Sequence, residues 1–461
     1  QPIGPKGAAA GATDFEGNAS SMEDERHVLF REEVSARFVK ICPTAWHDSC
    51  SMRADVLLPP ATGAAAPAMR PTVVVLGNMC AEDQFEVTAG GVSAQPNQLM
   101  EEQHAALLQA KLSNAPQRLQ SQVNHLQHVQ KYDGLELQRH ALDQIPVVAM
   151  DVLATKGDES YELAFMRPLL KWFKHEFFSW TNAPHCDSCG SRDTKGVGGT
   201  APNEVEKSYG AGSVEIGLCN TCGSQTRFPR YNDPGKLLES RTGRCGEWAN
   251  CFTLICRALG YEARHVHDWT DHVWTEIWSD SLQRWLHVDS CEAALDCPLV
   301  YEQGWGKKLT YCLAFGRDGA RDVSKRYTRK FDELLTRRSA FPERDLERVM
   351  VALDDFALDR SLMRFPPEVG QQRRQAMAQR AEKETAELAK AAAEGALKAG
   401  EQVGRTSGDK EWREQRGELG SDEAARQKAL AFSASGVGDM TQAAPVAGSW
   451  AQSAANFGLR D

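Results

Sequence analysis

The chain has 461 residues and a formal net charge of −10, and 25% of its residues are charged. This length can support two or three domains around a large core. The negative charge argues against general affinity for nucleic acid or an anionic membrane, and no apolar run is long enough to span a bilayer. We therefore expect a globular protein with no nucleic-acid partner and no membrane insertion.

The N-terminal part predicts little chemistry. Residues 1–25 are rich in Gly, Ala and Ser, so we expect disorder there, and they contain no basic region followed by a hydrophobic one, so we expect no secretory signal. Residues 26–115 remain unassigned, with strand-like pieces at 37–41, 55–58 and 72–76.

Two helical regions follow. Residues 98–140 carry apolar residues at helical spacing. Their four histidines lack the spacing of a metal site and are expected on solvated helix faces: His104, His125, His128 and His140. A second helix is expected from Glu159 to about Trp180.

Four of the thirteen cysteines form two Cys-X-X-Cys-Gly pairs: Cys186, Cys189, Cys219 and Cys222. Each turn can bring two sulfurs to one ion, and its glycine relieves backbone strain. Four protein thiolates leave no open position, so we expect one structural Zn²⁺. Two redox motifs are the alternative, but these would place one pair at a helix start. The odd cysteine total indicates a reducing compartment, the cytosol or nucleus, rather than a disulfide framework.

One cysteine stands at an expected helix start. Apolar residues at helical spacing run from Cys245 to Leu259, and Gly260 occupies the expected C-cap position. A thiol in the first turn feels the positive end of the helix dipole, which lowers its pKa. The alternative is a small packing residue.

Three strand-like pieces follow at residues 262–269, 272–278 and 284–290. If residues 279–282 form a four-residue hairpin loop, Trp278 pairs with Gln283 and His272 lies opposite Asp289 on the same face. That carboxylate can orient the imidazole, and a thiolate on the adjoining helix would complete a triad with Cys245. A purely structural histidine–aspartate pair is the alternative.

Residues 226–328 contain the motifs GRCGEWAN, TDHVWTE and WLHVD. This run strongly resembles the core of the cytoplasmic peptide:N-glycanases, which belong to the transglutaminase-like superfamily of papain-type cysteine hydrolases. The resemblance implies hydrolysis of the β-aspartylglucosaminyl amide of misfolded N-glycoproteins in ER-associated degradation, with conversion of asparagine to aspartate through a thioester. It implies a cytoplasmic location, also nuclear, and makes the proteasome or ubiquitin-shuttle proteins candidate partners.

The resemblance also implies roles for individual residues. Cys245 matches the nucleophile, His272 the base and Asp289 the orienting acid. The four paired cysteines match the zinc ligands. Glu292 and Trp305 match positions that line the sugar site, and Trp180 matches one near the nucleophile. Core packing is the alternative for either tryptophan.

The expected fold class is α+β: a transglutaminase-like core whose nucleophile begins a helix packed on an antiparallel sheet, with an inserted four-cysteine subdomain and helical flanks. We expect this core at residues 116–330, its metal subdomain at 183–226, a helical extension at 331–403 and a disordered tail at 404–461. No PUB-type adaptor or C-terminal mannose-binding domain is recognisable. Another transglutaminase-like cysteine hydrolase or transferase, and a non-catalytic module of the DNA-repair type, remain the alternatives.

Overall fold

The computed structural model describes residues 38–41, 72–75, 98–147, 150, 154, 160–363, 367–390 and 396–420. The chain divides into two compact units, residues 1–90 and 91–461. In the first unit, β1 (Phe38–Ile41) pairs in parallel with β2 (Thr72–Val75), at two of the expected strand positions. The segments expected as disordered (1–25) and as a strand (55–58) lie outside the described residues.

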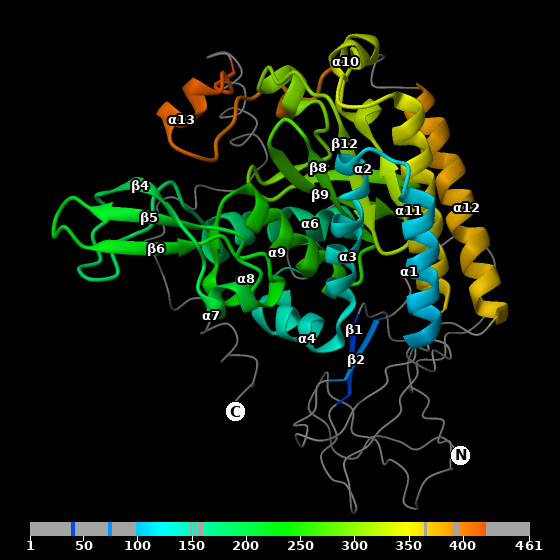
Figure 1. The fold of residues 1–461 in the computed structure, drawn as a ribbon, viewed down its shortest axis with the longest axis horizontal. Helices are drawn as coiled ribbons and strands as arrows, with labels where there is room; N and C mark the ends of the chain where they lie inside the picture. Colours follow the sequence, from blue (N-terminus) through cyan, green and yellow to red (C-terminus); the bar gives the residue numbers. More distant parts are fainter. Residues whose placement is uncertain are drawn as a thin grey trace, which may run out of the picture. The chain divides into compact units, whose positions relative to one another are not determined.

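A six-stranded antiparallel sheet forms the centre of the second unit (Figure 1). Its order is β11-β10-β9-β8-β12-β13. The strands are β8 (Ala263–Asp268), β9 (His272–Ser279), β10 (Arg284–Asp289), β11 (Ala294–Leu295), β12 (Cys312–Gly316) and β13 (Ala320–Asp322). The three strands expected after Gly260 are confirmed, and the mixed helix-and-sheet class with them.

The register of the β9–β10 hairpin differs from the expected one. Trp278 pairs with Trp285 rather than with Gln283, so the four-residue loop spans 280–283. The carboxylate of Glu162, remote in sequence, accepts hydrogen bonds from the hydroxyls of Ser279 and Ser281 and fixes this loop. The difference is two residues, which preserves the face on which each side chain lies. His272 and Asp289 therefore still share a face.

Helix α9 (Cys245–Ala258) packs against β8 and β9 and is buried almost all round. It begins at the predicted residue and ends one residue before the predicted Leu259, which is the C-cap. Gly260 follows in a left-handed conformation (φ 83°). Other helices enclose it: α3 (Val123–Gln130), α4 (Leu135–Gln144), α6 (Tyr161–Trp172) and α8 (Pro234–Ser240), with α1 (Gln98–Leu112), α2 (Gln117–Gln120) and α7 (Glu204–Ser208) further out.

The helix expected to reach Trp180 ends earlier. α6 passes into a π-helical turn, η2 (Phe173–Phe177), and the chain then forms β3 (Ser179–Trp180), which pairs in parallel with β7 (Thr242–Gly243). The register sets Trp180 opposite Gly243, two residues before Cys245. Pairing with β7 is incompatible with a continued helix, and it places Trp180 beside the start of α9.

The two cysteine pairs lie at one end of a separate three-stranded sheet. β4 (Thr194–Thr200), β5 (Val214–Cys219) and β6 (Gln225–Pro229) form it in the order β4-β5-β6, within the range expected for the metal subdomain and ending slightly beyond it. In Figure 1 this green sheet extends to the left, on the side of the second unit opposite α11 and α12.

Helices beyond residue 330, where we expected an extension to the core, pack on the central sheet. α10 (Phe331–Arg337), α11 (Glu343–Leu362) and α12 (Pro367–Lys390) follow. Glu384 of α12 pairs with Arg264 of β8 and with Arg326, and these ion pairs tie the helix to the core. These ion pairs join residues far apart in sequence, so local composition carries no sign of them.

The expectation of a disordered tail from residue 404 is wrong for residues 404–420. This stretch is ordered and includes α13 (Lys410–Gln415). Its fold depends on contacts with distant residues, among them the pairing of Arg416 with Asp271. Residues 421–461 lie outside the described residues. No helix within the described ranges is both long and apolar enough to cross a membrane.

Candidate active site and metal centre

The start of α9 is held by a buried carboxylate. Glu247 accepts a hydrogen bond from the backbone N–H of Arg244 (3.0 Å) and two from the side chain of Arg230 (2.6 and 2.8 Å). A Cβ on Gly243 would lie 2.4 Å from that of Glu247, so only glycine allows this approach. These contacts fix the half-buried Cys245 in the first turn, where backbone N–H groups lack intrahelical partners.

The predicted histidine and aspartate are in contact. Nε2 of His272 lies 2.8 Å from Oδ2 of Asp289, and both side chains have no exposed surface. Asp289 also accepts hydrogen bonds from the hydroxyl of Tyr301 (2.9 Å) and the backbone N–H of Cys291 (2.8 Å). Because Nε2 is engaged, Nδ1 is the ring atom that remains for the thiol of Cys245; it has no hydrogen-bond partner among the described residues.

The electrostatics favour a charged pair. Burial would raise the pKa of Asp289, but the charge and hydrogen bond of His272 outweigh it and hold this pKa well below its usual value. Burial would lower the pKa of His272, but Asp289 and Cys245 raise it. Burial would raise the pKa of Cys245, yet the interaction with His272 and the charge of Arg405 lower it. A thiolate beside an imidazolium is the arrangement of an activated cysteine nucleophile.

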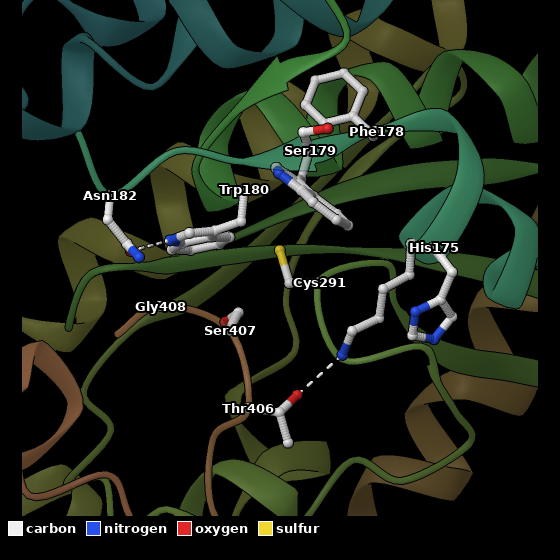
Figure 2. Close-up of a pocket in the computed structure, with 11 residues that line it drawn as sticks. His175, Phe178, Ser179, Trp180, Asn182, Cys291, Thr406, Ser407 and Gly408 are labelled. Atoms are coloured by element: carbon white, nitrogen blue, oxygen red, sulfur yellow. Dashed lines mark hydrogen bonds between the residues drawn. The ribbon is translucent and has the colours of Figure 1, made fainter. Parts of the chain in front are cut away.

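A cavity of about 400 Å³ lies next to this group (Figure 2). Figure 2 shows Cys291 between Trp180 on one side and Thr406 and Ser407 on the other. Cys245 does not line the cavity, but its neighbour Trp248 does. Of the three residues predicted for the sugar site, only Trp180 lines this space.

Glu292 and Trp305 are both engaged within the protein. The carboxylate of Glu292 accepts hydrogen bonds from the backbone N–H groups of Thr406 (2.9 Å) and Ser407 (3.0 Å). Trp305 is 1% exposed, and its ring centre lies 4.9 Å from that of His272. In this arrangement Glu292 binds the 404–420 stretch and Trp305 packs behind the histidine, so neither presents a free face to a ligand.

Sequence reasoning missed two groups at this site. The hydroxyl of Tyr301 is hydrogen-bonded to both Asp289 and His287 (2.9 and 2.7 Å). No motif around this residue indicated a role in the site. Arg405 carries a fully buried side chain whose charge acts on Cys245. The sequence signal that could have indicated the order of this stretch is Trp412, a large aromatic residue in the Ser-, Gly- and Ala-rich C-terminal part, because such a side chain is usually packed against the protein.

The four paired cysteines can hold a metal ion. Their sulfurs all lie within 4.8 Å of one another, with 3.5 Å between Cys186 and Cys222 and 3.6 Å between Cys189 and Cys219. Four thiolates around one zinc ion would be about 3.8 Å apart, from a Zn–S bond of about 2.3 Å. The glycines after each pair, Gly190 and Gly223, have φ of 71° and 74°, the left-handed conformation for which the expected turn needs glycine. All four side chains therefore fit one tetrahedral ion.

Three of the four histidines that we expected on solvated helix faces contact other side chains. His104 stacks on the ring of Phe356, with 4.5 Å between the ring centres. The ring of His125 lies 4.6 Å from that of His267, and Nε2 of His128 lies 3.0 Å from Oδ1 of Asn250. The helix that carries both, α3, packs on β12 and faces inward where the sequence pattern suggested a solvated face.

Two family models match the chain. Residues 200–290 match the transglutaminase-like superfamily core, and residues 265–389 match the Rad4 transglutaminase-like domain. Among solved structures, a Rad4–Rad23 complex bound to a 6-4 photoproduct UV lesion is 16% identical with a TM-score of 0.35, covering 58% of this chain and 60% of its own.

Curated relatives are much more similar in sequence. The peptide-N(4)-(N-acetyl-beta-glucosaminyl)asparagine amidase of Mus musculus is 44% identical over 308 residues, or 64% of this chain and 46% of the relative. That of Arabidopsis thaliana is 46% identical over 286 residues, or 61% and 38%. The chain thus spans less than half the length of these relatives. It is a homologue of the peptide-N(4)-(N-acetyl-beta-glucosaminyl)asparagine amidases and contains a transglutaminase-like domain.

Proposed function

We propose that this chain is a peptide:N-glycanase that hydrolyses the amide bond between an asparagine side chain and the first N-acetylglucosamine of an N-linked glycan. The observation that carries the proposal is the buried contact of His272 with Asp289, together with the lowered pKa of Cys245 beside it. Relatives at 44 and 46% identity are named for their action on the glucosaminyl-asparagine amide, which supplies the substrate class. Misfolded glycoprotein is the proposed physiological substrate.

In the first step, the Cys245 thiolate attacks the side-chain carbonyl carbon of the glycosylated asparagine. The tetrahedral oxyanion would receive the backbone N–H of Cys245 at the helix start. As the C–N bond breaks, the His272 imidazolium gives its proton to the departing glycosylamine nitrogen. A thioester and a free glycosylamine result.

In the second step, neutral His272 takes a proton from water, and the hydroxide attacks the thioester carbonyl. The C–S bond breaks, Cys245 leaves as thiolate, and His272 is again protonated. The product is aspartate in an intact peptide. Asp289 holds the imidazole orientation through both steps and stabilises its charged form.

The paired cysteines fit a structural role. Cys186, Cys189, Cys219 and Cys222 would hold one zinc ion, which supplies rigidity to the loops around it and no open coordination position. No cysteine within the described residues forms a disulfide, which supports a reducing location, and we place the protein in the cytoplasm.

The proposal is tested with a denatured N-glycoprotein in H₂¹⁸O. Release of glycan with one ¹⁸O atom in the resulting aspartate, without peptide cleavage, is the expected result. Cys245→Ala should abolish it. Cys256→Ala, a change at a fully buried cysteine on the same helix, is the matched control and should retain glycan release.

Other outcomes would overturn the assignment. Peptide cleavage without glycan release would indicate a protease, and amine incorporation without hydrolysis would indicate a transferase. Substantial glycan release by purified Cys245→Ala protein would exclude the proposed nucleophile. An inactive wild-type protein that binds DNA would favour a non-catalytic module.

A further inference from the structure

The stretch of residues 396–420, called here the C-terminal segment, is seated against the candidate active site by charged contacts. Its Arg416 pairs with Asp271 (2.7 Å), the residue before β9, and its Thr406 receives a hydrogen bond from Lys174 (2.9 Å; Figure 2). Glu292 accepts hydrogen bonds from two backbone N–H groups of the segment. The segment is therefore one wall of the site, anchored at three separate points.

Arg405 is the most buried cation of this segment, with 0% of its side chain exposed. Its guanidinium lies over three aromatic rings, at 5.6 Å from Trp180, 4.7 Å from Trp305 and 4.4 Å from Trp412. Nη1 donates to Glu418 (2.8 Å) and Nε to Ser407 (3.0 Å). Nη2 has no hydrogen-bond partner among the described residues.

An unused donor on a buried cation is costly unless something negative faces it. Within this site the negative charge forms on Cys245, beside His272. The guanidinium of Arg405 lies 4.7 Å from the ring centre of Trp305, and the centre of that ring lies 4.9 Å from that of His272, so the cation is one aromatic ring away from the triad. Its charge favours the anion of Cys245. We propose that Arg405 is a positioning residue that stabilises the thiolate of Cys245, and that the C-terminal segment is an essential part of the active site. This inference rests on the proposed role of Cys245 as nucleophile.

The charged and titratable groups around Cys245 come from several elements. His272 on β9 and Arg405 on the C-terminal segment favour its anion, whereas Asp271, before β9, opposes it. Cys291, after β10, has its pKa raised by burial and by the charge of Asp289. Arg416 neutralises Asp271, so the C-terminal segment acts twice in the same direction: it brings one cation and offsets one anion.

The test measures the thiol directly. Iodoacetamide alkylation of Cys245 in the full chain is followed against pH, with peptide mass spectrometry to locate the label. Arg405→Met retains most of the length of the side chain and removes its charge. The pH midpoint of alkylation should therefore rise by about one unit, and below the midpoint Cys245 should be alkylated about tenfold more slowly than in the wild type. Arg405→Lys keeps the charge and should stay close to wild type.

Glu418→Gln is a second variant with the opposite expected sign. It removes the carboxylate that partly neutralises Arg405, so the midpoint should fall below that of wild type. An unchanged midpoint in a folded Arg405→Met protein would overturn the proposal, as would equal shifts in the Met and Lys variants, which indicate packing alone. If Arg405→Met does not fold, the direction of the Glu418→Gln shift decides. Because alkylation requires no glycoprotein, this result is independent of whether the wild type releases glycan.

Discussion

Nε2 of His272 and Oδ2 of Asp289 are 2.8 Å apart with no exposed surface on either side chain. Asp289→Asn replaces the acceptor by an amide that favours the wrong imidazole tautomer. We expect glycan release to fall by about 10⁴-fold at neutral pH, with little change in KM. Steady-state kinetics on a denatured glycoprotein measure this, and a loss of less than tenfold would show that Asp289 does not orient His272.

Tyr301 holds the same carboxylate from the other side, through a hydroxyl 2.9 Å from Oδ2 of Asp289. Tyr301→Phe removes the hydrogen bonds of this hydroxyl to Asp289 and to His287. The bond to Asp289 is worth about 1 kcal/mol, so we expect kcat to fall roughly fivefold, and the lost bond to His287 should lower stability. Tyr327→Phe is the matched control, because this buried tyrosine bonds Trp274 and Glu276 instead of the triad. It should lower stability and leave kcat intact; equal effects on kcat would assign Tyr301 to packing.

The sequence predicted those parts of the site whose determinants are local. Helical spacing and Gly260 define α9, and strand alternation places His272 and Asp289 on one face. The predicted hairpin register was wrong because the loop is fixed by Glu162, a residue far earlier in the chain. The contact survived this error because a shift of two residues preserves the face.

The C-terminal segment was not predictable from its composition. The C-terminal part of the chain is rich in Ser, Gly and Ala, which is typical of disorder. The order of the segment depends on distant partners such as Glu292 and Asp271. α12 is a similar case, because its helical propensity is visible in the sequence but its packing is not. The carboxylate that docks the helix, Glu384, cannot be distinguished in the sequence from the many exposed charges around it, since its partners Arg264 and Arg326 are far away in the chain.

The metal centre gives a prediction about folding. Cys219→Ser removes one of four clustered sulfurs, so we expect loss of metal and a strongly reduced unfolding temperature, since a structural zinc site contributes on the order of 10 kcal/mol in small domains. Metal analysis and thermal unfolding measure both. Cys297→Ser, at a half-buried cysteine outside the cluster, should keep one zinc per chain. Correctly folded wild-type protein without metal would contradict the assignment.

Docking of α12 depends on Glu384, whose carboxylate lies 2.5 Å from Arg264 and 3.0 Å from Arg326. Glu384→Ala leaves two buried guanidinium groups short of a partner, so we expect a loss of about 3–5 kcal/mol in unfolding free energy. Urea denaturation measures it. Glu382→Ala, at an exposed position on the same helix, should change stability by less than about 0.5 kcal/mol. Equal effects would show that α12 is not held by these pairs.

Packed histidines should make the fold sensitive to mild acid. Burial, followed by the charges of His267 and His128, lowers the pKa of His125 from 6.5 to about 4. The unfolded chain therefore binds this proton more readily, so stability is fully present above about pH 6.5 and is lost as the pH falls toward 4. His125→Phe keeps a ring against Phe315 but cannot be protonated.

Urea midpoints at pH 7 and pH 5 measure this dependence. Between these values the wild type should lose about 1–2 kcal/mol more than His125→Phe, because carboxylates that titrate in the same range do so in both proteins. His104→Phe is the control: it also replaces a histidine stacked on an aromatic ring, that of Phe356 (4.5 Å between centres), but outside the packed group. It should follow the wild type. If His125→Phe loses as much stability as the wild type on acidification, a residue other than His125 carries the acid sensitivity.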